Sequence, residues 1–220
     1  MFPTLKNNHI TWYIVTEIVL SLLLFVLITS AVVFLLRGYL RKYKPADLRI
    51  FTSLQALHSP GNNRIMLGIT FLGKHQFLIP ANLLLIALFF FLGHQHWYAL
   101  NVLLVSLSSL LLMFMLKQLF RRNRPAVPLL FEAKGKSFPS GHAIMAVCFY
   151  GLLLQMLLHT GIAPSLKTLF TIFTVLLILS ISFSRVYLQV HYLSDVLAGL
   201  IIGCSWLLIC LHLLNKLEYV

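Results

Sequence analysis

Six long apolar segments take up more than half of the chain and limit the folds that it can adopt. They cover residues 13–36, 77–93, 97–116, 142–160, 167–186 and 194–214. Apolar and polar residues do not alternate within them, as they would in a membrane barrel, and about 20 apolar residues match one helix that crosses a bilayer. We therefore predict an all-α, polytopic membrane protein, with six transmembrane helices in a bundle that forms a single integral membrane domain over residues 1–220.

The composition agrees with a bilayer environment. Of the 220 residues, 60% are hydrophobic and 10% are charged, and the mean hydropathy is +0.92. A soluble domain carries about 25% charged residues. We expect no nucleic-acid partner despite the net charge of +12, because the chain has no soluble basic domain to bind one.

One long connection, residues 37–76, joins the first two segments. Pro45 can begin a helix within it. Apolar residues then follow at three-residue steps between polar ones: Leu48, Phe51, Leu54 and Leu57. This pattern predicts a short interfacial helix between the first two transmembrane helices. Residues 64–73 are apolar enough either to pack under the bundle or to lengthen the second transmembrane helix.

The basic residues are distributed unevenly across the membrane. Six crossings place both termini on one side, called side A, and the connections 37–76, 117–141 and 187–193 on the other, called side B. All lysines and arginines fall on side B except three: Lys6, Lys167 and Lys216. One interpretation is topological, because basic loops tend to stay in the cytoplasm. The other is functional, because side B would attract anionic lipid head groups.

The first of three polar clusters ends the third apolar segment. Lys117 and Arg124 are seven residues apart, so a helix would place both on nearly the same face, about two turns apart. Pro125 then discourages the helix from continuing. The alternative is that these cations, with Arg121 and Arg122 between them, are interfacial anchors.

The second cluster, Pro139-Ser140-Gly141-His142, precedes the fourth segment. Serine can cap a helix, and glycine lets the backbone approach a ligand closely. The free amides at a helix start form an anion site. The alternative is an ordinary helix cap followed by a surface histidine.

The third cluster is Ser184-Arg185, followed by His191 and Asp195. If the last helix extends back to His191, the histidine and Asp195 share a face. The carboxylate would then fix the tautomer of the imidazole and leave the other ring nitrogen free to attack. The alternative is a capping aspartate near an unrelated histidine.

Together the clusters supply three cations, two histidines and one carboxylate, which suits a phosphate ester. Polar groups of this kind are costly next to lipid, so they indicate function. The acidic residues are few and scattered: Glu17, Asp47, Glu132, Asp195 and Glu218. Two-metal phosphatase chemistry needs more carboxylate ligands than these, so we expect no metal and no cofactor.

In these residues the chain resembles the type 2 phosphatidic acid phosphatase family. The matching segments are KQLFRRNRP from Lys117, PSGH from Pro139 and SRVYLQVHYLSD from Ser184. The resemblance implies a metal-independent phosphatase with His191 as nucleophile, Asp195 as its orienting partner and His142 as the acid. It also implies residues that hold the phosphoryl oxygens: Lys117, Arg124, Ser140, Gly141 and Arg185. Gln189 and Leu193 depart from the family, which frequently has glycine and proline there.

We therefore expect an integral membrane phosphatase that removes the terminal phosphate of a lipid mono- or diphosphate through a phosphohistidine. Candidate substrates are undecaprenyl diphosphate, phosphatidylglycerophosphate, phosphatidate and lipid A. The alternatives are a phosphotransferase that moves phosphate to another lipid, and a non-catalytic lipid-phosphate binding or transport protein. The resemblance also places the site on the periplasmic or outer face of a bacterial inner membrane, which conflicts with the basic residues of side B.

Overall fold

The computed structural model describes the backbone of residues 4–93, 95–125, 130 and 135–218, and the side chains of these residues except 4–14, 36–46, 92 and 218. Lys6, Pro45, Glu132 and Glu218, which entered the predictions, lie outside the described side chains. The described elements are α1 (Thr4–Gln55), α2 (Pro60–Phe71), α3 (His75–Ala87), the π-helical turn η1 (Leu88–Leu92), α4 (His96–Phe120), α5 (Gly141–Leu158), α6 (Pro164–Tyr187) and α7 (Leu193–Glu218).

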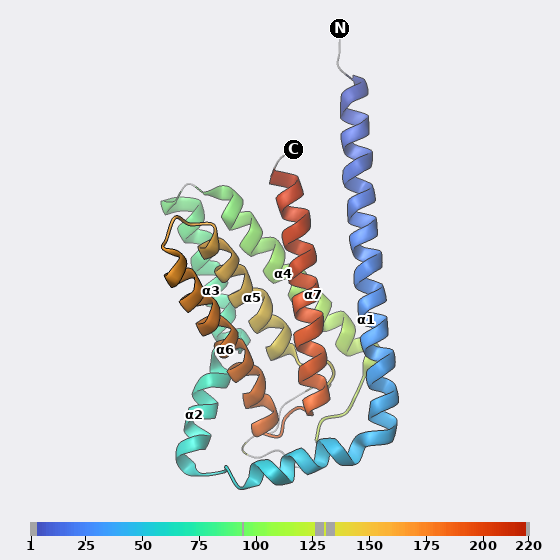
Figure 1. Ribbon diagram of the computed structural model, residues 1–220, viewed down its shortest axis with the longest axis vertical. Coiled ribbons are helices and arrows are strands. Elements are labelled where there is room, and N and C mark those ends of the chain that lie inside the picture. Colours follow the sequence, from blue (N-terminus) through green and yellow to red (C-terminus); the bar gives the residue numbers. More distant parts are fainter. Residues whose placement is uncertain (1–3, 94, 126–129, 131–134, 219–220) are drawn as a thin grey trace.

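Six stretches of the described chain are long and apolar enough to cross a membrane. They are Val15–Leu35, Pro60–Phe91, His96–Phe120, Gly141–Leu158, Pro164–Tyr187 and Leu193–Leu217. Each overlaps one predicted segment, and the ends differ by at most four residues except at the start of the second stretch. The predicted all-α bundle of six transmembrane helices is therefore confirmed. Figure 1 shows that α1 begins and α7 ends at the same end of this bundle.

The second stretch is longer than predicted because two helices follow one another. Pro60 occupies the first turn of α2, where a proline fits, and the Ser59 side chain caps the helix by accepting a hydrogen bond from the Asn62 amide at 3.1 Å. The chain turns between α2 and α3, where the Tyr150 hydroxyl donates to the Leu72 carbonyl at 3.0 Å. Of the two possibilities left open for residues 64–73, the structure thus shows a lengthened second membrane stretch, which consists of two helices rather than one.

The predicted interfacial helix is the last part of α1 rather than a separate element. The backbone is helical through residue 45, and Figure 1 shows α1 running beside α7, then bending to cross one end of the bundle. We call residues 47–55 the α1 arm. Phe51 and Leu54 are buried on the arm, whereas Leu48 is half exposed. Three-residue steps rotate each successive side chain by about 60° around a helix, so a row of four cannot share one face.

The core lies between α4, α5 and α7. Figure 1 places α5 inside the bundle, and its buried residues Ile144, Val147 and Leu152 pack in one cluster with α4 and α7. The approach of α7 to the start of α5 is very close. A Cβ added at Gly199 would lie 2.8 Å from the Ser140 carbonyl oxygen. Only glycine fits there, and small residues allow this kind of helix contact within membranes. The contact places the Pro139–His142 segment against α7.

Candidate active site

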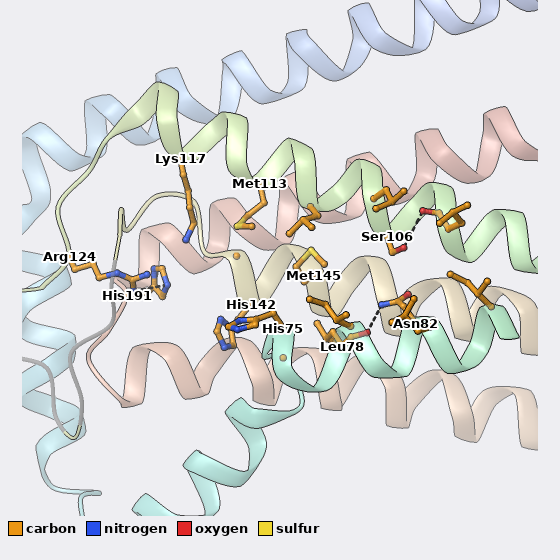
Figure 2. Close-up of a pocket in the computed structure, with 18 residues that line it drawn as sticks. His75, Leu78, Asn82, Ser106, Met113, Lys117, Arg124, His142, Met145 and His191 are labelled. Atoms are coloured by element: carbon orange, nitrogen blue, oxygen red, sulfur yellow. Dashed lines mark hydrogen bonds between the residues drawn. The ribbon is translucent and has the colours of Figure 1, made fainter. Parts of the chain in front are cut away.

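The two cations of the first cluster line the same cavity, one from a helix and the other from the loop that follows it. Lys117 lies in the last turn of α4, which ends at Phe120, and Arg121 adopts a left-handed conformation with φ of 46°. Arg124 therefore follows the helix instead of continuing it, so the predicted two-turn helical spacing is wrong. Both side chains nevertheless line one cavity, as Figure 2 shows.

Arg124 is held against the segment that carries His191. Its Nη1 donates to the Val190 carbonyl at 2.8 Å and lies 3.1 Å from His191 Nε2, while Nε donates to the Gly135 carbonyl at 3.1 Å. Burial lowers the pKa of Arg124, and Asp195 opposes that shift. The guanidinium is thus fixed by backbone carbonyls on two loops, and it lies directly beside the imidazole.

The loop before α7 brings His191 and Asp195 together. Because α7 begins at Leu193, the two residues do not share a helix, as the spacing had suggested. They meet across a turn instead, with Nδ1 of His191 3.6 Å from Oδ2 of Asp195. Gln189 in this loop has φ of 56°, in the region that favours glycine, which accounts for the glycine that the family often has there.

His191 is buried and neutral at pH 7. Burial lowers its pKa to about 4, with Arg124 and Arg185 acting in the same direction and Asp195 against it. Only 1% of the residue is exposed, yet it is one of the residues that line the cavity. A neutral imidazole keeps the lone pair that a nucleophile needs.

Asp195 receives hydrogen bonds that the sequence did not predict. Arg122 Nη1 donates to Oδ1 at 2.5 Å, and the Tyr192 amide donates to Oδ2 at 3.0 Å. The Ser137 hydroxyl also donates to Oδ2. In the sequence, Arg122 is one cation of a basic run and Ser137 belongs to no motif, so neither was predicted to contact Asp195. The buried carboxylate is thus surrounded by donors that satisfy it.

The start of α5 presents Ser140, Gly141 and His142. Ser140 precedes the helix, but its side chain makes no capping hydrogen bond, so that part of the prediction is wrong. Its amide instead donates to the Asp195 carbonyl at 3.0 Å. A Cβ at Gly141 would lie 2.8 Å from Met113 Sδ and 3.7 Å from Lys117 Nζ. The glycine therefore lets α5 approach α4 at the cavity.

Two polar atoms at this helix start are buried without a partner. They are Ser140 Oγ and His142 Nε2, which have no hydrogen bond within the part of the chain that the structure describes. Unpaired buried polar atoms are rare and indicate a ligand or a catalytic role. Figure 2 shows His142 at the same end of the cavity as Lys117 and His191.

Arg185 is placed differently from the other predicted cations. It lies in the last turn of α6, is 3% exposed and donates from Nη1 to Thr70 Oγ1 on α2 at 2.5 Å. It does not itself line the cavity, although its carbonyl accepts from the His191 amide at 3.3 Å. Its charge therefore acts on the imidazole of His191, whose pKa it helps to lower, from outside the cavity lining.

The cavity combines a polar end with a long apolar wall. Its volume is about 320 Å³. Lys117, Arg124, His142 and His191 line one end, and Figure 2 shows the rest continuing between α3 and α4. That part is lined mainly by apolar side chains, including Leu78, Ile79, Leu83, Ile86, Leu103, Leu107 and Leu110. Among the described residues, no group of three or more His, Cys, Asp and Glu side chains is placed to hold a metal ion.

A membrane-spanning helical bundle with two cations and two histidines at one end of an apolar cavity defines a class of protein: a membrane enzyme for phosphorylated lipids. The chain belongs to the PAP2 superfamily, whose sequence profile matches residues 98–219. The predicted family is therefore confirmed, and with it the prediction of an integral membrane lipid phosphatase.

Three comparisons place the chain within this family. It is 34% identical over 184 residues to phosphatidylglycerophosphatase B of Bacillus subtilis, covering 83% of this chain and 88% of that one. A crystal structure of a transmembrane PAP2-type phosphatidylglycerolphosphate phosphatase from Bacillus subtilis superposes with a TM-score of 0.74 at 30% identity, covering 93% of this chain and 97% of that one. A crystal structure of LpxE from Aquifex aeolicus superposes with a TM-score of 0.56 at 26% identity, covering 76% of this chain and 94% of that one. Both Bacillus subtilis relatives are named as phosphatases, so neither the phosphotransferase nor the non-catalytic binding or transport alternative is favoured.

Proposed function

We propose that this lipid phosphatase hydrolyses the terminal phosphate of phosphatidylglycerophosphate through a phosphohistidine intermediate on His191. The observation that carries the proposal is the cavity, in which the nucleophilic nitrogen and two cations lie at the end of an apolar space. A phosphomonoester at the polar end leaves room for a lipid along α3 and α4. The names of the two Bacillus subtilis relatives support the choice of substrate.

In the first step, the lone pair on His191 Nε2 attacks phosphorus. A nitrogen–phosphorus bond forms, the bond from phosphorus to the lipid oxygen breaks, and that oxygen takes a proton from His142. Asp195 faces Nδ1 and balances the positive charge that develops on the imidazole. This division of roles gives His191 the covalent step and His142 the general-acid step.

In the second step, water attacks the phosphohistidine. His142 now acts as the base and takes a proton from the water. The nitrogen–phosphorus bond breaks, its electron pair returns to Nε2, and inorganic phosphate leaves. Neither step needs a metal, because fixed cations stabilise the charge on the equatorial oxygens of the transition state.

Five residues complete the proposed phosphate site. Lys117 and Arg124 contact the phosphoryl oxygens from the cavity wall. Ser140 donates from its hydroxyl, because its amide is already bonded to the Asp195 carbonyl, and Gly141 donates from its amide at the start of α5, where helix amides favour an anion. The unpaired Ser140 hydroxyl supports its part. Arg185 adds positive charge near His191, and the planar guanidinium of an arginine suits phosphate oxygens.

We propose that the protein lies in a bacterial inner membrane, with side B on the periplasmic or outer face. The opposing argument is the basic excess on side B, which would favour the cytoplasm. Four of these cations have another role in this proposal: Lys117, Arg124 and Arg185 belong to the proposed phosphate site, and Arg122 is paired with Asp47 and Asp195. Setting these four aside reduces the excess but does not remove it, because 10 of the 14 basic residues remain on side B against three on side A.

The test is phosphate release by the purified protein in detergent micelles from four lipids: phosphatidylglycerophosphate, phosphatidate, undecaprenyl diphosphate and lipid A carrying a phosphate. The His191→Ala variant serves as the inactive control. We expect the highest kcat/KM on phosphatidylglycerophosphate, with one phosphate released for each lipid consumed. A clear preference for another lipid would refute the substrate, and phosphate found on a second lipid would refute hydrolysis.

A further inference from the structure

The two carboxylate oxygens of Asp195 have different partners. Its Oδ2 faces His191 Nδ1 at 3.6 Å and accepts from the Tyr192 amide and from Ser137. Its Oδ1 accepts from Arg122 Nη1 at 2.5 Å. Since Asp195 is fully buried, these donors determine the orientation of the carboxylate, and Arg122 is the charged one.

Arg122 is itself held at several points. Nη1 also donates to Ser194 Oγ at 3.0 Å, and Nη2 donates to Asp47 Oδ2 at 3.3 Å. The guanidinium lies 4.0 Å from the centre of the Tyr192 ring, which adds a cation–π contact. A planar fork with several donors can bridge two carboxylates in this way, whereas a lysine cannot.

Asp47 brings the α1 arm into this network. It is 2% exposed and accepts from Ser194 Oγ at 2.8 Å as well as from Arg122. Phe51, one turn further along the arm, stacks on Tyr192 with 5.8 Å between ring centres. The arm is therefore joined to the loop that carries His191 and Asp195 by both charge and packing.

We propose that Arg122 is a positioning residue for the reaction and that Asp47 on the α1 arm holds it in place. Arg122 keeps Asp195 ionised and turned so that Oδ2 faces His191. A buried carboxylate without its cation would be strongly disfavoured and would rotate or take up a proton. His191 would then lose the partner that sets its tautomer and stabilises its charge. The inference rests on the proposed roles of His191 and Asp195.

The first test is the Arg122→Gln variant, with Arg121→Gln as the matched control. Both changes remove one positive charge from adjacent residues. Arg121, however, is exposed, and within the described part of the chain its side chain makes one local hydrogen bond, from Nε to the Gln118 carbonyl. We expect Arg122→Gln to lower kcat by about 10–100-fold, the size of effect seen for groups that orient a functional histidine, with little change in KM. Arg122→Lys should recover part of the loss. Arg121→Gln should keep the wild-type kcat.

The second test asks whether Arg122 acts through Asp195. In an Asp195→Asn background, Arg122→Gln should cost little further activity, because the group that it positions has lost its charge. A full additional loss in that background, or a rise in KM without a fall in kcat, would overturn the proposal. Wild-type activity of Asp195→Asn alone would instead refute the proposed role of Asp195, so the two failures are distinguishable.

Asp47→Asn keeps the inference testable if Arg122→Gln does not fold. This variant retains Arg122 and nearly the same shape, and circular dichroism with size-exclusion elution in detergent reports whether it is folded. We expect a several-fold fall in kcat at unchanged KM, smaller than for the loss of Arg122. A folded Asp47→Asn protein with wild-type kcat would show that the α1 arm has no part in positioning.

Discussion

His191 and Asp195 face each other with 3.6 Å between Nδ1 and Oδ2, while Nε2 of the same imidazole lies 3.1 Å from Arg124 Nη1. A guanidinium can only donate hydrogen bonds. Nε2 therefore carries the lone pair, and Nδ1 carries the proton and points it toward the carboxylate. This tautomer is the one required for attack through Nε2. It is set by Arg124, which can only donate to Nε2, and by Asp195, which can only accept from Nδ1.

His142 is expected to matter most when the leaving group is poor. If it protonates the departing lipid oxygen, His142→Ala should lower kcat on a lipid phosphate by about 10²–10⁴-fold. An activated aryl phosphate has a leaving group that needs no proton, so the variant should retain much more of its activity on that substrate. His191→Ala should be inactive on both. Equal losses of His142→Ala on both substrates would contradict the assignment.

The low pKa of His191 predicts how stability depends on pH. The folded protein keeps this imidazole neutral down to about pH 4, whereas the unfolded chain protonates it near its ordinary value of about 6.5. Between these values the unfolded state binds more protons, so stability is complete above about 6.5 and falls as the pH drops toward 4.

Thermal unfolding in detergent between pH 4 and pH 8 measures this effect. The unfolding temperature of the wild type should fall below pH 6.5, and the fall should be smaller in a His191→Gln variant. The charges that act on the imidazole, those of Asp195, Arg124 and Arg185, remain in both proteins. The difference between the two pH profiles therefore measures the contribution of His191. Identical pH profiles for the two proteins would contradict the prediction.

A change in the apolar wall of the cavity should affect activity on lipid substrates but not on small soluble ones. Leu107 lines it, whereas Leu111, one turn along α4 and of similar exposure, does not. We expect Leu107→Trp to lower kcat/KM for a long-chain lipid phosphate by about 10-fold or more, with little effect on a small aryl phosphate. Leu111→Trp is the control. Equal effects of the two variants, or equal losses on both substrates, would show that the lipid does not lie along this wall.

Sidedness can be measured with two introduced cysteines. In a cysteine-free background, Lys136→Cys places an exposed thiol on side B, and Gln95→Cys places one in the side A connection between the second and third membrane stretches. Ser137 would be a poor reporter, because it is buried against Asp195. A membrane-impermeant reagent added to intact cells should label Lys136→Cys and leave Gln95→Cys unlabelled. The reverse pattern would place the site in the cytoplasm.

The sequence was sufficient to predict the helices and most of the polar residues that line one end of the cavity, and the failures have physical causes. Hydropathy located each of the six spans found in the described chain, because a segment within lipid must satisfy its backbone hydrogen bonds internally and therefore forms a long apolar helix. It could not show that the chain leaves α4 before Arg124, since a left-handed Arg121 has no sequence signal. The pairing of Asp47 with Arg122 joins residues 75 positions apart, and no local pattern encodes such a contact.

The departures from the family motif show a similar limit. Gln189 occupies a left-handed position that glycine usually takes, and only the backbone reveals why glycine is frequent there. Ser140 was predicted to be a helix cap from its place before α5, but its hydroxyl is left unpaired in the site. Functional positions break local rules when they serve a ligand instead of the fold.

The most direct test of the central claim is whether phosphate becomes attached to His191. Purified protein is mixed with lipid substrate carrying a labelled terminal phosphate, quenched in alkali within milliseconds and digested for mass spectrometry. We predict an acid-labile, alkali-stable phosphoryl group on the peptide that contains His191, appearing as a burst before steady turnover and absent from His191→Ala. Full turnover without labelled protein, or the same label in His191→Ala, would contradict the account.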